Sequence, residues 1–406
     1  MELFSRTLVY AVSIIDRTIR KCKEQSYPPT RKTTATSERK TVVIVATKAP
    51  PYLTGPAINA INRAKYLCEY FSVILYIPLL DKSSRKLKFG RDWNRFDSSE
   101  DYEVFLRDYF DLPSSMVLQF YAASSPAGSG TIVPDFKLRT QIAWRRIIED
   151  GDPAISMWRI KLNKDDVVVL HSSYRQICEK HNWLVARFAA HCFGKKMMQA
   201  AGKVFAISPS LMNCYEGTKL LLWINGVDQR FHLAPPPAAD SKQVYFLGKI
   251  IEWKRVDELA SILAKDGIDL DVYGYFDDSY DQSAPGSFLK NSFAHYRGKV
   301  DFDREDDLNV EAIFNSKVYV SNALDEGLCT TTCEAWTMGK YCVLRKAPCN
   351  EAFADLPNVI LFETDVQLTE AVRGCLRSSS IPTLLTLEDK KRFNWQSCTQ
   401  RFVENL

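Results

Sequence analysis

The chain has 406 residues, of which 25% are charged and 46% are hydrophobic, and this composition predicts a globular fold of two or three domains. No run of 18 uncharged apolar residues occurs, so the sequence does not predict a membrane-spanning helix. The net charge of +4 is unevenly placed, because residues 1–40 carry nine Lys or Arg against four acidic side chains. The confinement of the positive charge to this segment disfavours a nucleic-acid-binding protein.

The eleven cysteines are an odd number, and none of them forms a C-x-x-C pair. Several fall in predicted core elements, among them Cys333 and Cys342. This usage predicts reduced thiols in a cytosol-like compartment, and Cys329 with Cys333 lacks the further ligands that a zinc site needs.

The first forty residues begin with an apolar stretch, Leu3–Ile15, which Arg6 interrupts, and continue into a basic segment rich in Pro, Ser and Thr. No small-residue cleavage site follows, so a secretory signal is not predicted. Two interpretations remain open. The segment is either an amphipathic membrane-surface anchor with a polybasic flank, or a disordered or organelle-targeting leader.

Residues 41–80 predict a strand, a helix and a second strand. Thr41–Ala46 is rich in β-branched residues, as in a buried parallel strand; a helix is predicted from about Ala57, and SVILYIPLL is the next strand. Thr54 and Gly55 lie where the loop meets the helix, and glycine permits a close backbone approach to a ligand there. The loop lacks the G-x-G-x-x-G pattern, so an ordinary turn is the alternative.

Between residues 81 and 159 the sequence predicts only loops and short helices. A strand, Val167–Leu170, follows and ends in His171, at the edge where open α/β sheets bind ligands. A hydrogen-bonded structural histidine is the alternative. The segment at 182–202 has a helical apolar periodicity and is predicted to pack in the core, with partial insertion into a bilayer as the other possibility.

A proline-rich linker at residues 233–242 precedes a second strand, loop and helix. Lys249 ends the strand region and Lys254 begins the helix, so two cations are expected at a helix entrance, where they could neutralise a diphosphate. The alternative is a solvated basic surface. The sequence DLDVYGYFDD predicts the next strand, with Gly274 at its carboxyl end.

Glu326 and Glu334 bracket seven residues in a predicted strand, turn and helix N-terminus. SKVYVSN is typical of a buried strand, Gly327 suits a tight turn, and a helix is predicted after Thr330. One carboxylate then lies on the loop and the other in the first helical turns, so both can face a polyhydroxyl ligand above an anion-attracting helix end. The alternative is a solvated loop charge and an ordinary helix N-terminal carboxylate.

This segment resembles the E-x7-E signature of retaining glycosyltransferases with the GT-B fold, and DEGLCTTTCEAWTMGKYCVLRKAPCNEAF is most similar to the digalactosyldiacylglycerol synthases. That family often has Asp at the place of Glu326. The similarity spans about Thr41 to Val403 and is weak between Asp81 and Arg159. Further residues that match family or superfamily patterns are Pro51, Thr54, Gly55, Asn59, Arg63, Ala64, Gly248, Lys249 and Lys254.

The resemblance implies an α/β protein of GT-B fold, with two Rossmann-like, doubly wound domains that face a central cleft. The implied divisions are a leader at 1–40, an acceptor-binding domain at 41–231, a nucleotide-sugar-binding domain at 232–385, and a final helix at 386–406 that returns to the first domain. It also implies a retaining galactosyltransferase that converts UDP-galactose and monogalactosyldiacylglycerol into digalactosyldiacylglycerol.

By the same resemblance, Lys249 and Lys254 stabilise the leaving diphosphate, Glu326 and His171 contact the donor sugar, and Glu334 binds the ribose. The other implied donor-binding residues are Thr54, Gly55, Gly248, Gly274, Gly298, Gly327, Leu328, Cys329 and Thr330. No enzymic nucleophile is assigned, because the acceptor hydroxyl is expected to attack from the same face and to pass its proton to the departing phosphate. Neither a metal nor another cofactor is expected, because Lys249, Lys254 and the helix N-termini can stabilise the leaving diphosphate by themselves.

The expected partners are therefore UDP-galactose, a galactolipid acceptor and a peripheral membrane surface, by resemblance the cytosol-facing side of the outer plastid envelope. Two alternatives stay open. One is a GT-B transferase that moves glucose or mannose to a different lipid or glycan. The other is a protein that binds a nucleotide sugar or a lipid without turnover.

Overall fold

The computed structural model describes residues 40–48, 50, 55–89, 96, 98–124, 133–134, 145–149, 162–171, 195–196, 198–212, 215–276, 291–300, 302, 307–324, 326–377 and 379–406. The predicted leader up to residue 39, Thr54 and most of the predicted helix at 182–202 lie outside the described residues.

The first sheet has eight strands in the order β4-β3-β2-β1-β5-β6-β7-β8, and its neighbours are parallel except for β3 and β4. Its central strand, β1 (Thr41–Ala46), is buried, as its β-branched sequence predicts. The remaining strands are β2 (Ser72–Leu80), β3 (Val117–Ser124), β4 (Val133–Pro134), β5 (Arg145–Glu149), β6 (Val167–Leu170), β7 (Lys203–Ala206) and β8 (Lys219–Leu220). The accompanying helices are α2 (Gly55–Leu67), α3 (Lys82–Phe89), α4 (Ser99–Phe110) and α8 (Pro209–Met212), whereas α9 (Gln229–Leu233) packs in the core of the second half.

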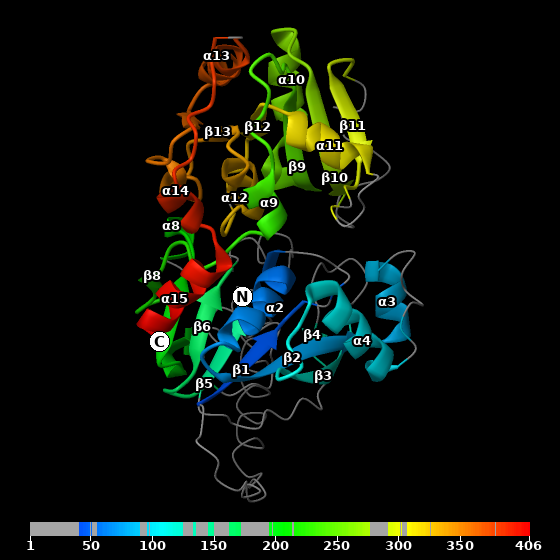
Figure 1. The fold of residues 1–406 in the computed structure, drawn as a ribbon, viewed down its shortest axis with the longest axis vertical. Coiled ribbons are helices and arrows are strands. Elements are labelled where there is room, and N and C mark those ends of the chain that lie inside the picture. Colours follow the sequence, from blue (N-terminus) through cyan, green and yellow to red (C-terminus); the bar gives the residue numbers. More distant parts are fainter. Residues whose placement is uncertain are drawn as a thin grey trace, which may run out of the picture.

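The second sheet has six parallel strands in the order β11-β10-β9-β12-β13-β14 (Figure 1). The strands are β9 (Val244–Ile250), β10 (Leu270–Phe276), β11 (Ala294–Gly298), β12 (Val318–Ser321), β13 (Tyr341–Arg345) and β14 (Val359–Phe362). The helices of this half are α10 (Val256–Lys265), α11 (Leu308–Asn315), α12 (Thr330–Thr337) and α13 (Asp365–Leu376).

Both sheets reverse their strand order next to their first strand, between β1 and β5 and between β9 and β12. In open α/β sheets ligands bind outside the carboxyl ends of the strands at such a reversal. The prediction of two doubly wound, Rossmann-like sheets is therefore confirmed.

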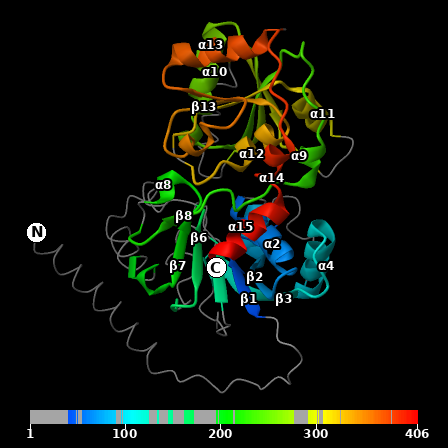
Figure 2. The ribbon, with the colours of Figure 1, turned by 60° about the vertical axis from the view of Figure 1, so that its left-hand side comes forward.

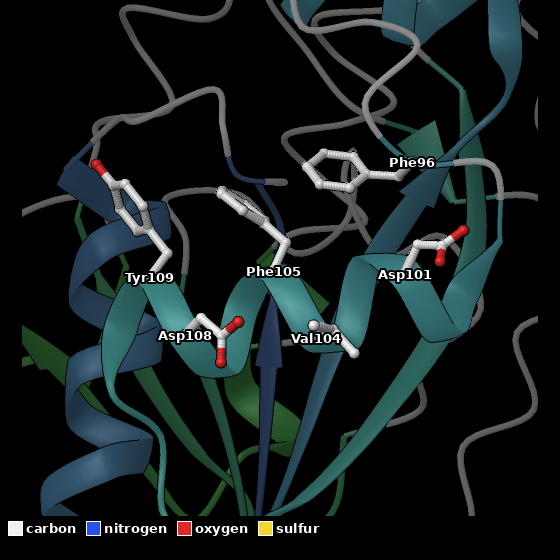
Figure 3. A pocket seen from close by; sticks show the side chains of 6 residues that line it. All are labelled: Phe96, Asp101, Val104, Phe105, Asp108 and Tyr109. Carbon is white, nitrogen blue, oxygen red and sulfur yellow. The ribbon is translucent and has the colours of Figure 1, made fainter.

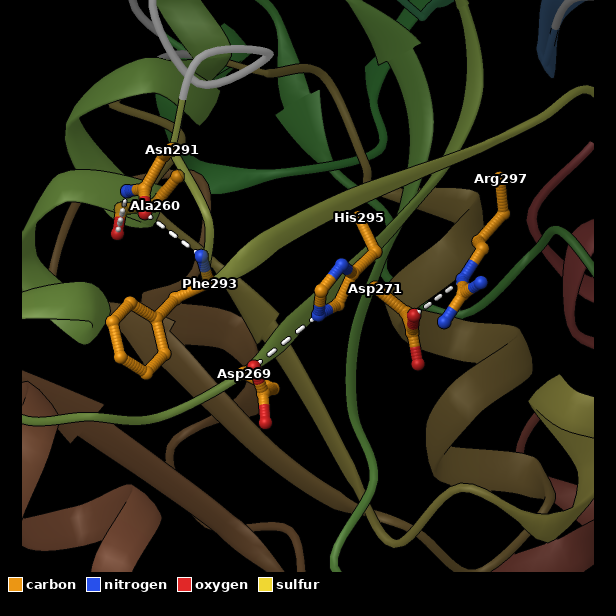
Figure 4. Close-up of polar contacts among 7 residues, drawn as sticks. All are labelled: Ala260, Asp269, Asp271, Asn291, Phe293, His295 and Arg297. Carbon is orange, nitrogen blue, oxygen red and sulfur yellow. Dashed lines mark hydrogen bonds and ion pairs between the residues drawn. The ribbon is translucent and has the colours of Figure 1, made fainter.

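The outer strand β11 is paired with β10 through its backbone and is linked to this part of the chain by two side-chain contacts (Figure 4). His295 Nε2 lies 3.2 Å from Asp269 Oδ1, and Arg297 Nε lies 2.6 Å from Asp271 Oδ1. Charged side chains along an edge strand discourage further strand pairing, so this edge of the sheet is protected.

The chain passes between the two hydrophobic cores twice, and the two crossings touch. Ile224 packs in the core of the first sheet, whereas Val227 already packs in the core of the second, a few residues before the predicted boundary at residue 231. The return crossing runs from Phe393 to Phe402. A Cβ atom at Gly226 would lie 2.6 Å from Trp395 Cγ, so glycine is needed where the crossings meet.

The final segment is two helices, α14 (Leu387–Lys391) and α15 (Trp395–Asn405), and the prediction of one continuous helix is wrong. Asn394 ends the continuity because its side chain accepts a hydrogen bond from the Ser397 N–H and so caps α15. As predicted, α15 returns to the first half (Figure 2). There the Trp395 ring stacks on Tyr66 with a centroid distance of 5.7 Å.

Replacing Phe402 by alanine is expected to cost about 3–5 kcal/mol of unfolding free energy, because this fully buried ring packs against Phe205 and beneath Arg63. Urea unfolding of the variant and of the wild type measures the difference. Glu404→Ala, at an exposed position of the same helix, is the control and should change stability little. An equal midpoint for Phe402→Ala and the wild type would show that α15 is not held by this contact.

Candidate functional site

The two halves meet where β6 ends and where the loop after β12 carries Glu326 and Gly327. A Cβ atom built on Gly327 would lie 1.7 Å from the carbonyl oxygen of His171, so the two backbones are in direct contact. Ser210, in α8, donates a hydrogen bond of 2.9 Å to the Glu326 carbonyl. The structure thus brings His171 and the glutamate loop together.

Glu326 forms an ion pair with Lys254, in which Nζ lies 2.7 Å from Oε1 and both side chains are only 11–12% exposed. Burial opposes the charge of Lys254, but the Glu326 carboxylate raises the pKa of the ammonium group above its usual value. The prediction that Lys254 begins the helix is wrong. Lys254 lies in a 3-10 turn, Glu252–Lys254, which precedes the helix. Arg255, at φ 52°, then redirects the chain into α10.

Two glycines make room for this lysine. Gly248 in β9 has φ 149°, and a Cβ atom there would lie 2.9 Å from Lys254 Nζ. Gly274 in β10 has φ 135°, and its Cβ atom would lie 1.8 Å from the Gly248 carbonyl oxygen. An L side chain rarely adopts such φ values, so both positions require glycine. Lys249 follows Gly248 and is partly buried, in register with Tyr275.

The N-termini of α2 and α12 approach each other across the interface. A Cβ atom at Gly55 would lie 3.2 Å from Thr330 Oγ1, the first residue of α12. Each helix N-terminus carries unpaired N–H groups and a partial positive charge, so two of them side by side favour an anion. The predicted helix start at Ala57 is two residues late, because α2 begins at Gly55.

The loop between Glu326 and α12 is anchored by apolar contacts. Leu328 packs against the cores of both halves, which fixes the loop at the interface. Cys329 is buried, and its Sγ lies 3.5 Å from the hydroxyl of Tyr319. Burial, with a contribution from Glu326, raises the pKa of this thiol, so Cys329 is a packing residue in its protonated form.

Glu334 lies in the second turn of α12 and is partly buried. Burial and the nearby Asp228 carboxylate raise its pKa to about 8, although Arg230 and Lys254 oppose the shift. The shift favours the protonated carboxyl over the carboxylate in the ligand-free protein. Asp228, the N-cap of α9, and Arg230, in the first turn of that helix, are neighbours that the sequence analysis did not assign to the site.

This shift predicts that Glu334→Gln gains stability over the wild type as the pH rises from about 4.5 to about 8. A carboxyl whose pKa is raised in the folded state contributes stability that is present below the unfolded value and is lost as the pH rises through the folded value. Glutamine stays neutral and avoids this loss. Thermal melts of both proteins across the interval should diverge by several degrees; parallel melting curves would contradict the burial of a charge at Glu334.

Among the remaining predicted residues, Gly298 lies at the end of edge strand β11 with φ 88°, and no described atom lies within 4 Å of its Cβ position. A hollow of about 410 Å³ runs along α4 (Figure 3), and neither Glu326 nor Lys254 lines it. It is lined by Phe96, Asp101, Val104, Phe105, Asp108 and Tyr109, none of which was predicted in the site.

The described residues contain free thiols but no cluster of side chains that could bind a metal. Within those ranges, no three His, Cys, Asp or Glu side chains gather in a way that could hold a metal ion. The cysteines of the same ranges are free thiols. No described helix is both long and apolar enough to cross a membrane.

Comparison with known proteins finds relatives in sequence and in fold. No protein-family model matches the chain. It is 27% identical over 398 residues to digalactosyldiacylglycerol synthase 1, chloroplastic, of Glycine max, a match that covers 89% of this chain and 49% of that protein. The chain thus spans about half the length of the synthase 1 relatives that it matches.

Two solved structures resemble the whole fold. The sucrose-phosphate synthase of Thermosynechococcus elongatus has a TM-score of 0.63 at 13% identity, covering 90% of this chain and 98% of that one. Anabaena HepE, crystallised with UDP and glucose, has a TM-score of 0.60 at 13% identity, covering 90% and 99%. The chain therefore has the GT-B fold and is similar in sequence, over 89% of its length, to the digalactosyldiacylglycerol synthases.

Proposed function

We propose that the protein is a retaining glycosyltransferase that transfers galactose from UDP-galactose to monogalactosyldiacylglycerol and forms digalactosyldiacylglycerol. The sequence similarity to synthases of that name supports the substrates. The observation that carries the proposal is the Glu326–Lys254 pair, mostly buried beside His171 and two facing helix N-termini. Such a set of charges suits a donor that combines a sugar with a diphosphate.

The residues have distinct proposed tasks. Glycosyl transfer builds positive charge on the sugar ring and negative charge on the leaving diphosphate. Lys254, with Lys249 and the N-termini of α2 and α12, would stabilise the diphosphate, while Glu326 and His171 would hold the hydroxyl groups of the sugar. Glu334 would accept hydrogen bonds from the ribose. The acceptor hydroxyl would attack on the face that the diphosphate leaves and pass its proton to it.

The proposal includes neither a metal nor another cofactor, because the cations named above can neutralise the leaving group. It also includes binding to the surface of a membrane, where the galactolipid resides. The relatives are named as chloroplastic, which supports a plastid location. The cytosol-facing side of the outer envelope is part of the proposal itself.

The test is to incubate the purified chain with UDP-galactose, UDP-glucose or GDP-mannose and vesicles that contain monogalactosyldiacylglycerol, with and without EDTA. We expect mass spectrometry to detect a digalactosyl lipid only when UDP-galactose is the donor, and the same amount of product when EDTA is present. NMR should show an α-linkage, as retention requires. A product from another donor would replace the galactosyl proposal by a different hexosyl transfer. UDP binding without any product would favour a binding protein.

A further inference from the structure

Three buried side chains form a connected line behind the site. Arg63 in α2 is 0% exposed, Asn225 in the segment before α9 is 5% exposed, and His171 after β6 is 6% exposed. The Arg63 Nη2 donates to Asn225 Oδ1 over 2.6 Å, and Asn225 Nδ2 lies 3.5 Å from His171 Nδ1. The resemblance pattern included Arg63 and His171 but gave no part to Asn225.

The order of donors along this line fixes the orientation of the amide. A guanidinium group has only donors, so the atom of Asn225 that faces Arg63 must be the oxygen. The amide NH2 of Asn225 then faces His171, and it too can only donate. The Nδ1 atom of the histidine ring must therefore accept.

The acceptor role of Nδ1 determines the protonation of the ring. A neutral imidazole has one N–H and one acceptor nitrogen, so a ring that accepts at Nδ1 carries its proton on Nε2. The Nε2–H group can therefore donate a hydrogen bond to a hydroxyl or ring oxygen of a sugar.

Arg63 is itself held in place from the far side. Its Nη1 donates to the Ile224 carbonyl over 3.2 Å, and its Cζ lies 4.4 Å from the centroid of the Phe402 ring in α15. The returning helix α15 lies beside α2 in both overall views (Figures 1 and 2). The line therefore runs from the C-terminal helix through Arg63 and Asn225 to His171.

We propose that Asn225 and Arg63 are positioning residues that hold His171 in its Nε2–H tautomer, as a hydrogen-bond donor to the donor sugar. This inference rests on the proposed function for its catalytic consequence but not for the tautomer. Asn225 orients the ring and assigns its proton, and Arg63 orients Asn225.

The decisive variant is Asn225→Asp, which keeps the size of the side chain but replaces the NH2 donor by an acceptor. Arg63 can pair with one carboxylate oxygen, so folding is expected to survive, while the other oxygen now accepts from Nδ1–H. The neutral ring then has no proton on Nε2. Asn225→Ala removes the partner without offering a new one and is expected to leave the two tautomers mixed.

The tautomer is measured without any substrate, by 15N NMR of the protein labelled at histidine, with the His171 signals identified by their loss in His171→Gln. We expect a bare Nδ1 in the wild type and a protonated Nδ1 in Asn225→Asp. Asn315→Asp, which introduces the same charge at an exposed position at the end of α11, is the matched control and should leave the His171 signals unchanged.

Transfer kinetics supply the second measurement. At alkaline pH we expect Asn225→Asp to lower kcat on the order of 10-fold to 100-fold, with little change in the KM for the acceptor. As the pH falls, a second proton on the ring restores Nε2–H, so the variant should recover relative to the wild type. A variant that is merely misfolded would be impaired at every pH.

The outcomes separate the two proposals. A protonated Nδ1 in the wild type, or unchanged ring signals in Asn225→Asp, overturns the positioning role. Wild-type kcat and pH profile in Asn225→Asp overturn its part in the reaction. The expected NMR result with no transfer from any nucleotide sugar supports the tautomer and rejects the proposed function instead.

Discussion

Replacing Lys254 with methionine is expected to lower the turnover number for galactosyl transfer on the order of 100-fold, with a smaller change in the KM for the donor. The ammonium group lies 2.7 Å from Glu326, in the region where the two halves meet. The diphosphate carries more negative charge in the transition state than in the bound substrate, so the loss of a cation costs more there. Steady-state kinetics with UDP-galactose measure both constants.

The single variant also leaves Glu326 mostly buried without its cation, and breaking such a pair costs about 3–5 kcal/mol of stability. The double variant Lys254→Met/Glu326→Gln separates the two effects, because it removes both charges. We expect it to recover unfolding free energy but not turnover. The same substitutions in the exposed pair Lys346–Glu363 are the control and should change neither property. Wild-type turnover in Lys254→Met would remove this lysine from the reaction.

Gly327→Ala is expected to reduce transfer more than 100-fold, an order of magnitude typical of misplaced catalytic groups, while both halves stay folded. Its Cβ atom would lie 1.7 Å from the carbonyl oxygen of His171, which belongs to the backbone and cannot rotate away. The loop would have to withdraw from β6 and would carry Glu326 with it. Transfer assays and thermal melts, made on the same preparation, measure the two effects.

Two companion variants set the scale for this steric effect. Gly374→Ala lies in α13, where no described atom is within 4 Å of the new Cβ, so activity should be unchanged and stability slightly higher. Ser210→Ala removes the 2.9 Å hydrogen bond to the Glu326 carbonyl and should have a smaller effect than Gly327→Ala. Normal kcat in Gly327→Ala would mean that the contact between the halves is not needed for transfer.

The elements nearest the sheet centres were the most predictable from the sequence. β1 and β6 have the predicted bounds, because buried parallel strands need continuous apolar, β-branched runs that are visible in the sequence. The break between α14 and α15 was missed although its signal was present, since Asn394 stands three residues before Ser397 as an N-cap does. A helical apolar pattern that continued across the break concealed it.

The residues of the site also fall into two groups, those that the sequence indicated and those that only the structure revealed. Lys254, Glu326, Glu334 and His171 stood out as charged or polar residues at strand ends and helix starts, where their positions in the chain are informative. Ser210 and Asn225 belong to no motif, so they became visible only through their contacts with Glu326 and His171. Asp228 was not assigned to the site either, because its effect on the pKa of Glu334 depends on tertiary proximity.

The sequence by itself determined the two strand-and-helix halves, the kinds of residue at their strand ends and the glycines beside them, because these follow from local backbone preference and burial. Only the tertiary structure decided that Lys254 pairs with Glu326, that Gly327 lies against His171 and that α15 reaches Arg63. Such contacts join residues far apart in the chain, and their distances depend on how two cores pack together, which no local pattern encodes.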